Sequence, residues 1–244
     1  MLTERSEIQF GLTTIPFLVR RSNRRTTVAL TVEPPGKLVV TAPRNASITR
    51  LNGLVRNKAR WVVERIKRTS DVPPPHPRRE FVSGETVLYL GRQYRLKAVS
   101  GGEGEAAALH GRWLHVPVPG NLHGSDRAQA VRHALRAWLK AHAERRLPLR
   151  LAALCKRFSI DVPPIVVREQ RKRWGSCDTK GTVRLNWRII QAAPSHIDYV
   201  LVHELVHLRH ANHTRAFWAE VERMMPDYEQ RRRELRRTGA SLEW

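Results

Sequence analysis

Apolar and polar positions alternate along the first part of the chain. Between Phe17 and Ala42, two β-branched runs with this alternation flank a Pro-Pro-Gly turn, which predicts a β-hairpin. The spacing then becomes helical, with Ser47 placed as an N-cap. We therefore expect a single helix from Ser47 to Lys67, with Trp61 near its apolar face. The apolar stripe consists of Leu51, Leu54, Val55, Ala59, Val62, Val63 and Ile66.

A proline-rich segment interrupts these patterns. The sequence DVPPPHPRR, from Asp71 to Arg79, has four prolines in nine residues, which neither a helix nor an inner strand accommodates. It is the best candidate for an internal boundary. Short alternating stretches broken by glycines follow, and they predict a small antiparallel β region. These stretches are Thr86 to Leu90, Gln93 to Ala98 and Trp113 to Val116.

Helical periodicity returns in the last half of the chain. A basic helix is predicted from Asp126 to Leu147, and its pattern can continue across Pro148 to Phe158. The remaining predicted elements are strands at Ile165 to Arg168 and Thr182 to Asn186, a helix from Ser195 to His210 capped by Ser195, and a helix from Thr214 to Met225 that ends at Pro226. The patterns predict an α+β protein with regions 1–75, 76–125 and 126–244, or one unit formed by the whole chain. No internal repeat is evident.

The charge of the chain changes the expected partners. Lysine and arginine total 44 against 22 acidic residues, a net charge of +22, which predicts attraction to nucleic acid or another polyanion. The alternative is that many arginines form solvated helix faces. Two cysteines are too few for a disulfide scaffold or a thiolate zinc site. The amino terminus has no signal-peptide core and no stretch is long and apolar enough to span a bilayer, so we expect a cytoplasmic protein without a membrane partner.

The segment HELVH, in the last third of the chain, carries the strongest chemical signal. It places His203 and His207 four residues apart, on one face of the predicted helix, so both imidazoles can reach one ion. Apolar residues flank them, which indicates a shielded cavity. A catalytic zinc takes three protein ligands and one water. We predict that Glu204 does not bind the metal and instead takes a proton from the zinc-bound water and passes it to the leaving amine.

The third ligand must come from outside this motif. His213 is the preferred candidate because the Ala-Asn-His sequence allows a turn that returns its ring to the ion. His210 is the competitor, although it lies in the same predicted helix only three residues beyond His207. Phe217 and Trp218 are expected to pack behind His213.

The loop RKRWGSCDTKG supports two interpretations. In one, it lines the substrate groove, with Arg171, Arg173 and Trp174 contacting the substrate and the basic cluster binding a carboxylate or phosphate. In the other, it is a tight hairpin whose tryptophan belongs to the core. Cys177 is not expected to be a nucleophile, because a thiolate needs a base partner and the local histidines are assigned to the metal.

Several segments, as they stand here, resemble the YgjP-like metallopeptidase domain, a bacterial family similar to the SprT-like zinc peptidases. They are RKRWGSC, GTVRLNWRI, IDYVLVHELVHLRHANHTRAFW and MMPDY, with weaker collinear agreement upstream. The resemblance implies a zincin-like core, in which a small sheet packs on the HExxH helix, preceded by a β-rich amino-terminal region with helices. It also implies that His203, His207 and His213 ligate zinc and that Glu204 is the base. It supplies no substrate.

These observations lead to one main hypothesis and two rivals. The main hypothesis is a zinc-dependent metallopeptidase that cleaves proteins or peptides, with a basic surface that favours nucleic-acid-associated substrates. The first rival is a basic nucleic-acid-binding protein with a structural or vestigial zinc site, in which the helix from Asp126 to Leu147 and the basic loop contact phosphates. The second is a hydrolase of phosphodiesters, for which two-metal carboxylate sites are better suited.

Overall fold

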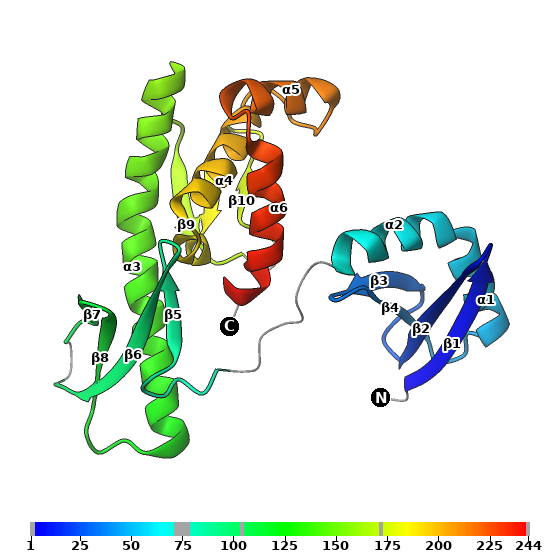
Figure 1. The fold of residues 1–244 in the computed structure, drawn as a ribbon, viewed down its shortest axis with the longest axis horizontal. Coiled ribbons are helices and arrows are strands. Elements are labelled where there is room, and N and C mark those ends of the chain that lie inside the picture. Colours follow the sequence, from blue (N-terminus) through cyan, green and yellow to red (C-terminus); the bar gives the residue numbers. More distant parts are fainter. Residues whose placement is uncertain (1–2, 71–78, 103–104, 171–172, 243–244) are drawn as a thin grey trace. The chain divides into compact units, whose positions relative to one another are not determined.

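The chain folds as two compact units, residues 1–76 and 77–244. The computed structural model describes residues 3–70, 79–102, 105–170 and 173–242 (Figure 1). Both units combine small sheets with helices, so the chain is of mixed α+β class. The predicted regions 76–125 and 126–244 both lie in the second unit, where they share one hydrophobic core.

The first unit is a four-stranded sheet covered on one face by two helices. Its elements are β1 (Thr3–Phe10), β2 (Thr13–Ser22), β3 (Ala29–Glu33), β4 (Lys37–Pro43), α1 (Ile48–Asn57) and α2 (Ala59–Ser70). The strand order is β1-β2-β4-β3. The predicted hairpin is confirmed between β3 and β4, but the run that precedes the turn is divided into β2 and β3, and β2 pairs with β4 in parallel.

The segment predicted as a single helix from Ser47 to Lys67 forms two helices, so this prediction is wrong in the number of helices. Ser47 is the N-cap of α1, as predicted, and its hydroxyl accepts from the backbone N–H of Arg50. The chain turns at Lys58, however, and continues as α2. The turn redirects the apolar stripe, so that Val62 is buried while Trp61 is 45% exposed and does not face the core.

The second unit begins with another four-stranded sheet, in the order β5-β6-β8-β7. Its elements are β5 (Thr86–Tyr89), β6 (Arg92–Ser100), β7 (Ala108–His110), β8 (Trp113–Val118), α3 (Gly124–Phe158), β9 (Ile165–Arg168), β10 (Gly175–Cys177), β11 (Val183–Asn186), η1 (Trp187–Gln191), α4 (Pro194–Val206), α5 (Arg215–Met224), α6 (Tyr228–Gly239) and η2 (Ala240–Leu242). The sequence predicted an antiparallel sheet, and this is wrong for one pair of strands, because β6 and β8 run parallel.

The two four-stranded sheets therefore share one topology. In each, two hairpins lie side by side and their second strands pair in parallel. Helices cover one face of each sheet, since the buried residues of α1 and α2 join the first core and those of α3 join the second. This repeat of topology was not evident from the sequence.

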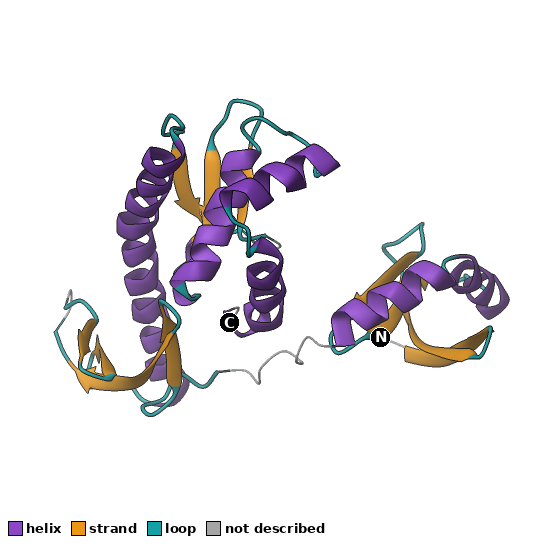
Figure 2. Ribbon diagram, turned by 45° about the horizontal axis from the view of Figure 1, so that its top comes forward, coloured by secondary structure: helices purple, strands orange, loops and turns teal. Residues whose placement is uncertain are grey.

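Helix α3 connects the sheet to the candidate site. It continues through Pro148 as one helix of 35 residues. Figure 2 shows the four-stranded sheet against one end of α3 and the three-stranded sheet, in the order β10-β11-β9, against the other. The helix with the HELVH motif, α4, begins at Pro194 and ends at Val206, so it is shorter than predicted, and Ala193 rather than Ser195 is its N-cap. None of the helices in the described part of the chain has the length and apolar character that a membrane crossing requires.

Candidate metal centre

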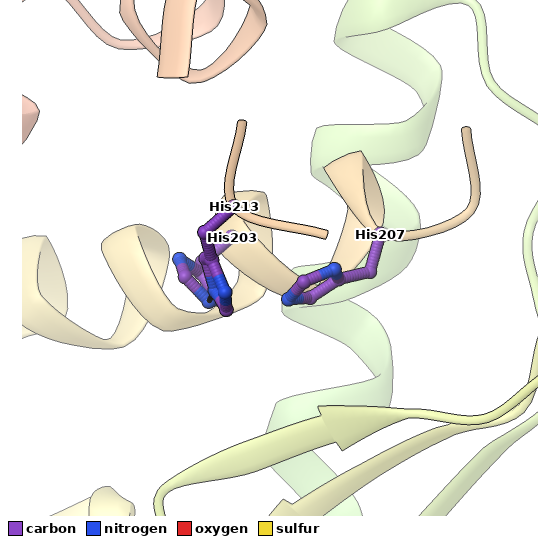
Figure 3. A group of neighbouring side chains, drawn as sticks. All are labelled: His203, His207 and His213. Atoms are coloured by element: carbon purple, nitrogen blue, oxygen red, sulfur yellow. Dashed lines mark hydrogen bonds between the residues drawn. The ribbon is translucent and has the colours of Figure 1, made fainter. Parts of the chain in front are cut away.

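Three histidines converge at the end of α4. His203 lies in the last turn of the helix, and His207 follows its last residue with a helical backbone (φ −62°, ψ −20°), so the predicted one-face spacing is kept. His213 approaches from the loop that precedes α5. One ring nitrogen from each histidine lies within 4.8 Å of the other two. Figure 3 shows the ring of His207 pointing toward the pair formed by His203 and His213.

The ring nitrogens are oriented for ligation. The Nε2 atoms of His203 and His213 are 3.0 Å apart. Nitrogens on a tetrahedral zinc, each about 2.0–2.1 Å from the ion, are about 3.3 Å apart, close to this separation. The Nδ1 of His207 lies 3.0 Å from the backbone carbonyl of His210. A carbonyl only accepts, so Nδ1 carries the proton and Nε2 keeps a lone pair for a metal.

His210 takes a supporting position. Its backbone carbonyl orients His207, whereas its ring is not part of the three-histidine cluster. Phe217 is fully buried with its ring centroid 4.6 Å from those of both His207 and His213, and Trp218 stacks on His213 at 5.6 Å. The predicted packing of these aromatic residues behind His213 is confirmed.

Burial makes the cluster receptive to a cation. The Nδ1 of His203 is buried without a hydrogen-bond partner. Burial, followed by the neighbouring rings of His207 and His213, lowers the pKa of His203 to about 3. The imidazole is therefore neutral near pH 7, which is the form that ligates a metal. Three imidazole nitrogens within 4.8 Å of one another are a donor set and a geometry that fit zinc.

Glu204 is a buried carboxyl group beside these ligands. It is only 4% exposed, and its Oε2 has no hydrogen-bond partner. Burial raises the pKa of Glu204 to about 8, although the charge of Arg173 acts in the opposite direction. An uncompensated buried carboxyl costs free energy, and such groups are concentrated at functional sites.

Strand β10 runs directly against Glu204. A Cβ atom added to Gly175 would lie 2.6 Å from Oε1, 2.7 Å from Cγ and 2.9 Å from Cδ of Glu204. A side chain at this position would displace the carboxyl group of Glu204. Because β10 is the edge strand of its sheet, Glu204 packs against the outermost strand. The sequence gives no signal for this role of Gly175, since the contact depends on the packing of β10 against α4.

The loop before β10 contains the residues predicted to bind substrate. Arg173 is exposed and close enough to Glu204 to affect the pKa of that carboxyl. Trp174 is half-buried, and a Cβ atom on Gly239 would lie 3.3 Å from its ring, so it packs near the end of α6. Arg171 lies outside the described residues. The assignment of substrate binding to these three residues stays a prediction.

Two further features of the site bear on the earlier predictions. Burial, followed by the charge of Glu204, raises the pKa of the Cys177 thiol, which opposes a nucleophilic role, as expected.

Helix α6, which the sequence analysis missed, carries Arg232 over the ring of Trp218 at 4.4 Å. The charge of Arg232 contributes to the lowered pKa of His213, after burial and His207.

Comparison with known proteins identifies the family. Residues 26–238 match the family model described as YgjP-like, metallopeptidase domain. No curated protein matches the chain significantly. Among solved structures, the chain is similar to the metallopeptidase zymogen of Pyrococcus abyssi abylysin, with 23% identity and a TM-score of 0.34, over 36% of this chain and 91% of that one. The family model covers most of the sequence, and the resemblance seen in the motifs is confirmed: the chain belongs to the YgjP-like metallopeptidase domain family.

Proposed function

We propose that this protein is a zinc-dependent peptidase whose site is formed by His203, His207, His213 and Glu204. The observation that carries the proposal is a three-histidine cluster whose first member is followed in sequence by a buried glutamate, with an Oε2 that has no hydrogen-bond partner and a side chain that packs against β10. We also propose that the sheet β10-β11-β9 and α4 form a zincin-like core, because β10 packs against the residue that follows the first ligand.

The number of ligands favours a catalytic site over a structural one. Structural zinc sites are closed by four protein ligands, whereas catalytic sites use three and keep one position open. Within the described residues, the cluster has three members. When bound there, zinc acts as a Lewis acid that polarises a carbonyl group and makes a water molecule more acidic.

Glu204 is suited to move the proton. Its carboxyl group is shielded from solvent, and burial raises its pKa from the usual carboxyl range toward neutral pH. A zinc ion bound nearby would favour the carboxylate form, which accepts a proton from water. Glu204 thus takes the proton of the attacking water and delivers it to the amine that leaves.

The edge of β10 is suited to hold the peptide. An extended peptide can add to a strand edge through main-chain hydrogen bonds, independently of its side chains. Gly175, on this edge, contacts Glu204. A peptide paired with β10 would therefore place a backbone carbonyl close to the carboxyl group, which supports a peptide bond as the substrate.

Metal analysis tests the ligand set. We expect about one zinc per wild-type chain and loss of that zinc in His213→Ala. His210→Ala is the matched control, because the backbone carbonyl that orients His207 remains. Casein cleavage by the wild type should stop on chelation and return with zinc. Cleavage that survives complete removal of the metal would refute the proposal.

A further inference from the structure

The outer face of the sheet β5-β6-β8-β7 carries cations and flat rings in register. Side chains of directly paired residues lie on the same face of a sheet. One row across the four strands is therefore Thr86, Arg95, Trp113 and His110. The next row is Lys97, His115 and Ala108. These rows contain no acidic residue.

These side chains are available to a ligand. The side chain of Trp113 is 41% exposed. A tryptophan ring has a large apolar surface, so a ligand that covers it would bury much apolar area. Arg95 and Lys97 are also exposed. Arg95 donates a long hydrogen bond of 3.5 Å to the carbonyl of Gly84, and within the described residues neither side chain forms an ion pair with a carboxylate. The opposite face of the sheet is the buried one, with Leu96 and Leu114 fully covered.

Arg112 extends this face at one end. It lies in the turn between β7 and β8, and with Arg92, Tyr94 and Arg95 it lines a hollow of about 620 Å³. Three arginines thus line one hollow, and Trp113 directly follows one of them, Arg112, in the chain. The rings of His110 and His115 lie 4.7 Å apart, and desolvation, followed by the charges of His110 and Lys97, lowers the pKa of His115.

Several arginines of α3, the helix that the sequence analysis considered for phosphate contacts, form contacts within the protein. Arg136 pairs with Glu169 and Arg150 with Asp198. Others contact neighbouring elements: Arg127 donates to the carbonyl of Ala98, Arg132 lies over Phe81, and Arg146 lies over Tyr89. The sheet face is therefore the better candidate for an anionic ligand.

We propose that the outer face of β5-β6-β8-β7 binds single-stranded nucleic acid, with Trp113 stacking on a base and Arg95, Lys97 and Arg112 contacting phosphates. Stacking on an exposed ring requires the flat face of a base, which a duplex hides. The cations supply the salt-dependent attraction to the backbone. RNA and single-stranded DNA share this chemistry. The proposal does not depend on peptidase activity.

Fluorescence anisotropy with the full chain tests the base contact. The probe is a labelled single strand of about 15 nucleotides, in ribose and deoxyribose forms, with a duplex of the same length as competitor. We expect Trp113→Leu to weaken binding by ~10-fold, since it removes a stacking ring, and Trp113→Phe to retain most of the affinity. Trp61→Ala, at the similarly exposed tryptophan of α2, is the matched control and should bind as the wild type does.

Charge reversal tests the phosphate contacts. The double variant Arg95→Glu with Lys97→Glu should lower the slope of log affinity against log salt by about 1.4, the value for two lost phosphate contacts on a single strand. The control, Arg5→Glu with Lys37→Glu, makes the same change in net charge at exposed positions of the first unit. A preference for ribose or deoxyribose identifies which strand is bound.

Three results would overturn the proposal. The first is wild-type affinity in Trp113→Leu, and the second is equal loss of affinity in the two double variants, which would indicate attraction to net charge alone. The third is tighter binding of the duplex than of the single strand. Each variant is checked by its unfolding transition and zinc content, and Trp113→Phe keeps the stacking test valid if Trp113→Leu folds poorly.

Discussion

The two four-stranded sheets have the same topology but different outer faces. In the first unit, one row on the face opposite the helices is Arg5, Leu18, Val39 and Thr31, of which Val39 is only 1% exposed, and nearby Arg20 is paired with Glu33 at 2.9 Å. The corresponding face of the second unit has Trp113 together with Arg95 and Lys97, which form no ion pair with any carboxylate in the described part of the chain. A shared pattern of strand pairing therefore fixes which side chains face outward, while their chemistry is free to differ.

The elements that follow each sheet differ as well. In the first unit, the chain turns at Lys58 and both helices stay on their own sheet. In the second, α3 extends beyond the sheet to pack against η1, β9 and α4, and one core reaches from β5 to η2. This continuous core connects the four-stranded sheet to the candidate metal centre, and the following predictions test the contrast.

The largest effect is expected from matched cavities in the two cores. Leu38→Ala in β4 and Leu114→Ala in β8 each remove a buried leucine, at 1% and 0% exposure, and each should lower the free energy of unfolding of its own unit by about 2–5 kcal/mol. Only Leu114→Ala should lower the temperature at which zinc is released. Thermal unfolding with a zinc indicator measures both, and a single transition shifted equally by the two variants would show that the units are not independent.

A smaller effect is expected from Gly175→Ala. The new methyl group must displace the carboxyl group of Glu204, and a misplacement of this size can lower catalytic rates by about 100-fold. The bound zinc should be unchanged. The control is Gly53→Ala in α1, where a Cβ atom meets nothing within 4 Å. Normal casein cleavage by Gly175→Ala would show that the contact has no catalytic role.

The two N-caps provide a third comparison. The side chains of Ser47 and Thr214 accept from the backbone N–H groups of Arg50 and Phe217, so Ser47→Ala and Thr214→Ala should each cost about 1 kcal/mol. Thr214 directly follows His213, and its loss should also weaken zinc binding. Competition with a chelator of known affinity measures this. Equal zinc affinity in the two variants would mean that the cap does not position His213.

The smallest effect concerns the outer faces. Arg20→Ala removes the ion pair with Glu33, in which the arginine side chain is 42% exposed, and should destabilise the first unit by at most about 1 kcal/mol. Arg95→Ala should leave the stability of the second unit unchanged. Urea unfolding distinguishes the two. A marked loss of stability in Arg95→Ala would show that this residue is structural.

The convergence of the three histidines was easier to predict from the sequence than the pairing of the strands. The spacing of His203 and His207 defines a helix face, and the short loop to His213 limits where that ring can lie, so the cluster could be predicted locally. Alternation identifies strands but not their direction, and the parallel pairing of β6 with β8 was therefore missed. Helix α6 was missed because it is rich in arginine and Leu235 is among its few buried apolar residues.

The measurement that tests the central claim most directly is casein cleavage by Glu204→Gln, compared at equal bound zinc with the wild type. The amide has nearly the same size as the carboxyl group but cannot exchange the proton. We predict unchanged zinc content and a loss of cleavage of at least ~100-fold. Cleavage at the wild-type rate by the zinc-loaded variant would contradict the assignment of this site as a peptidase centre.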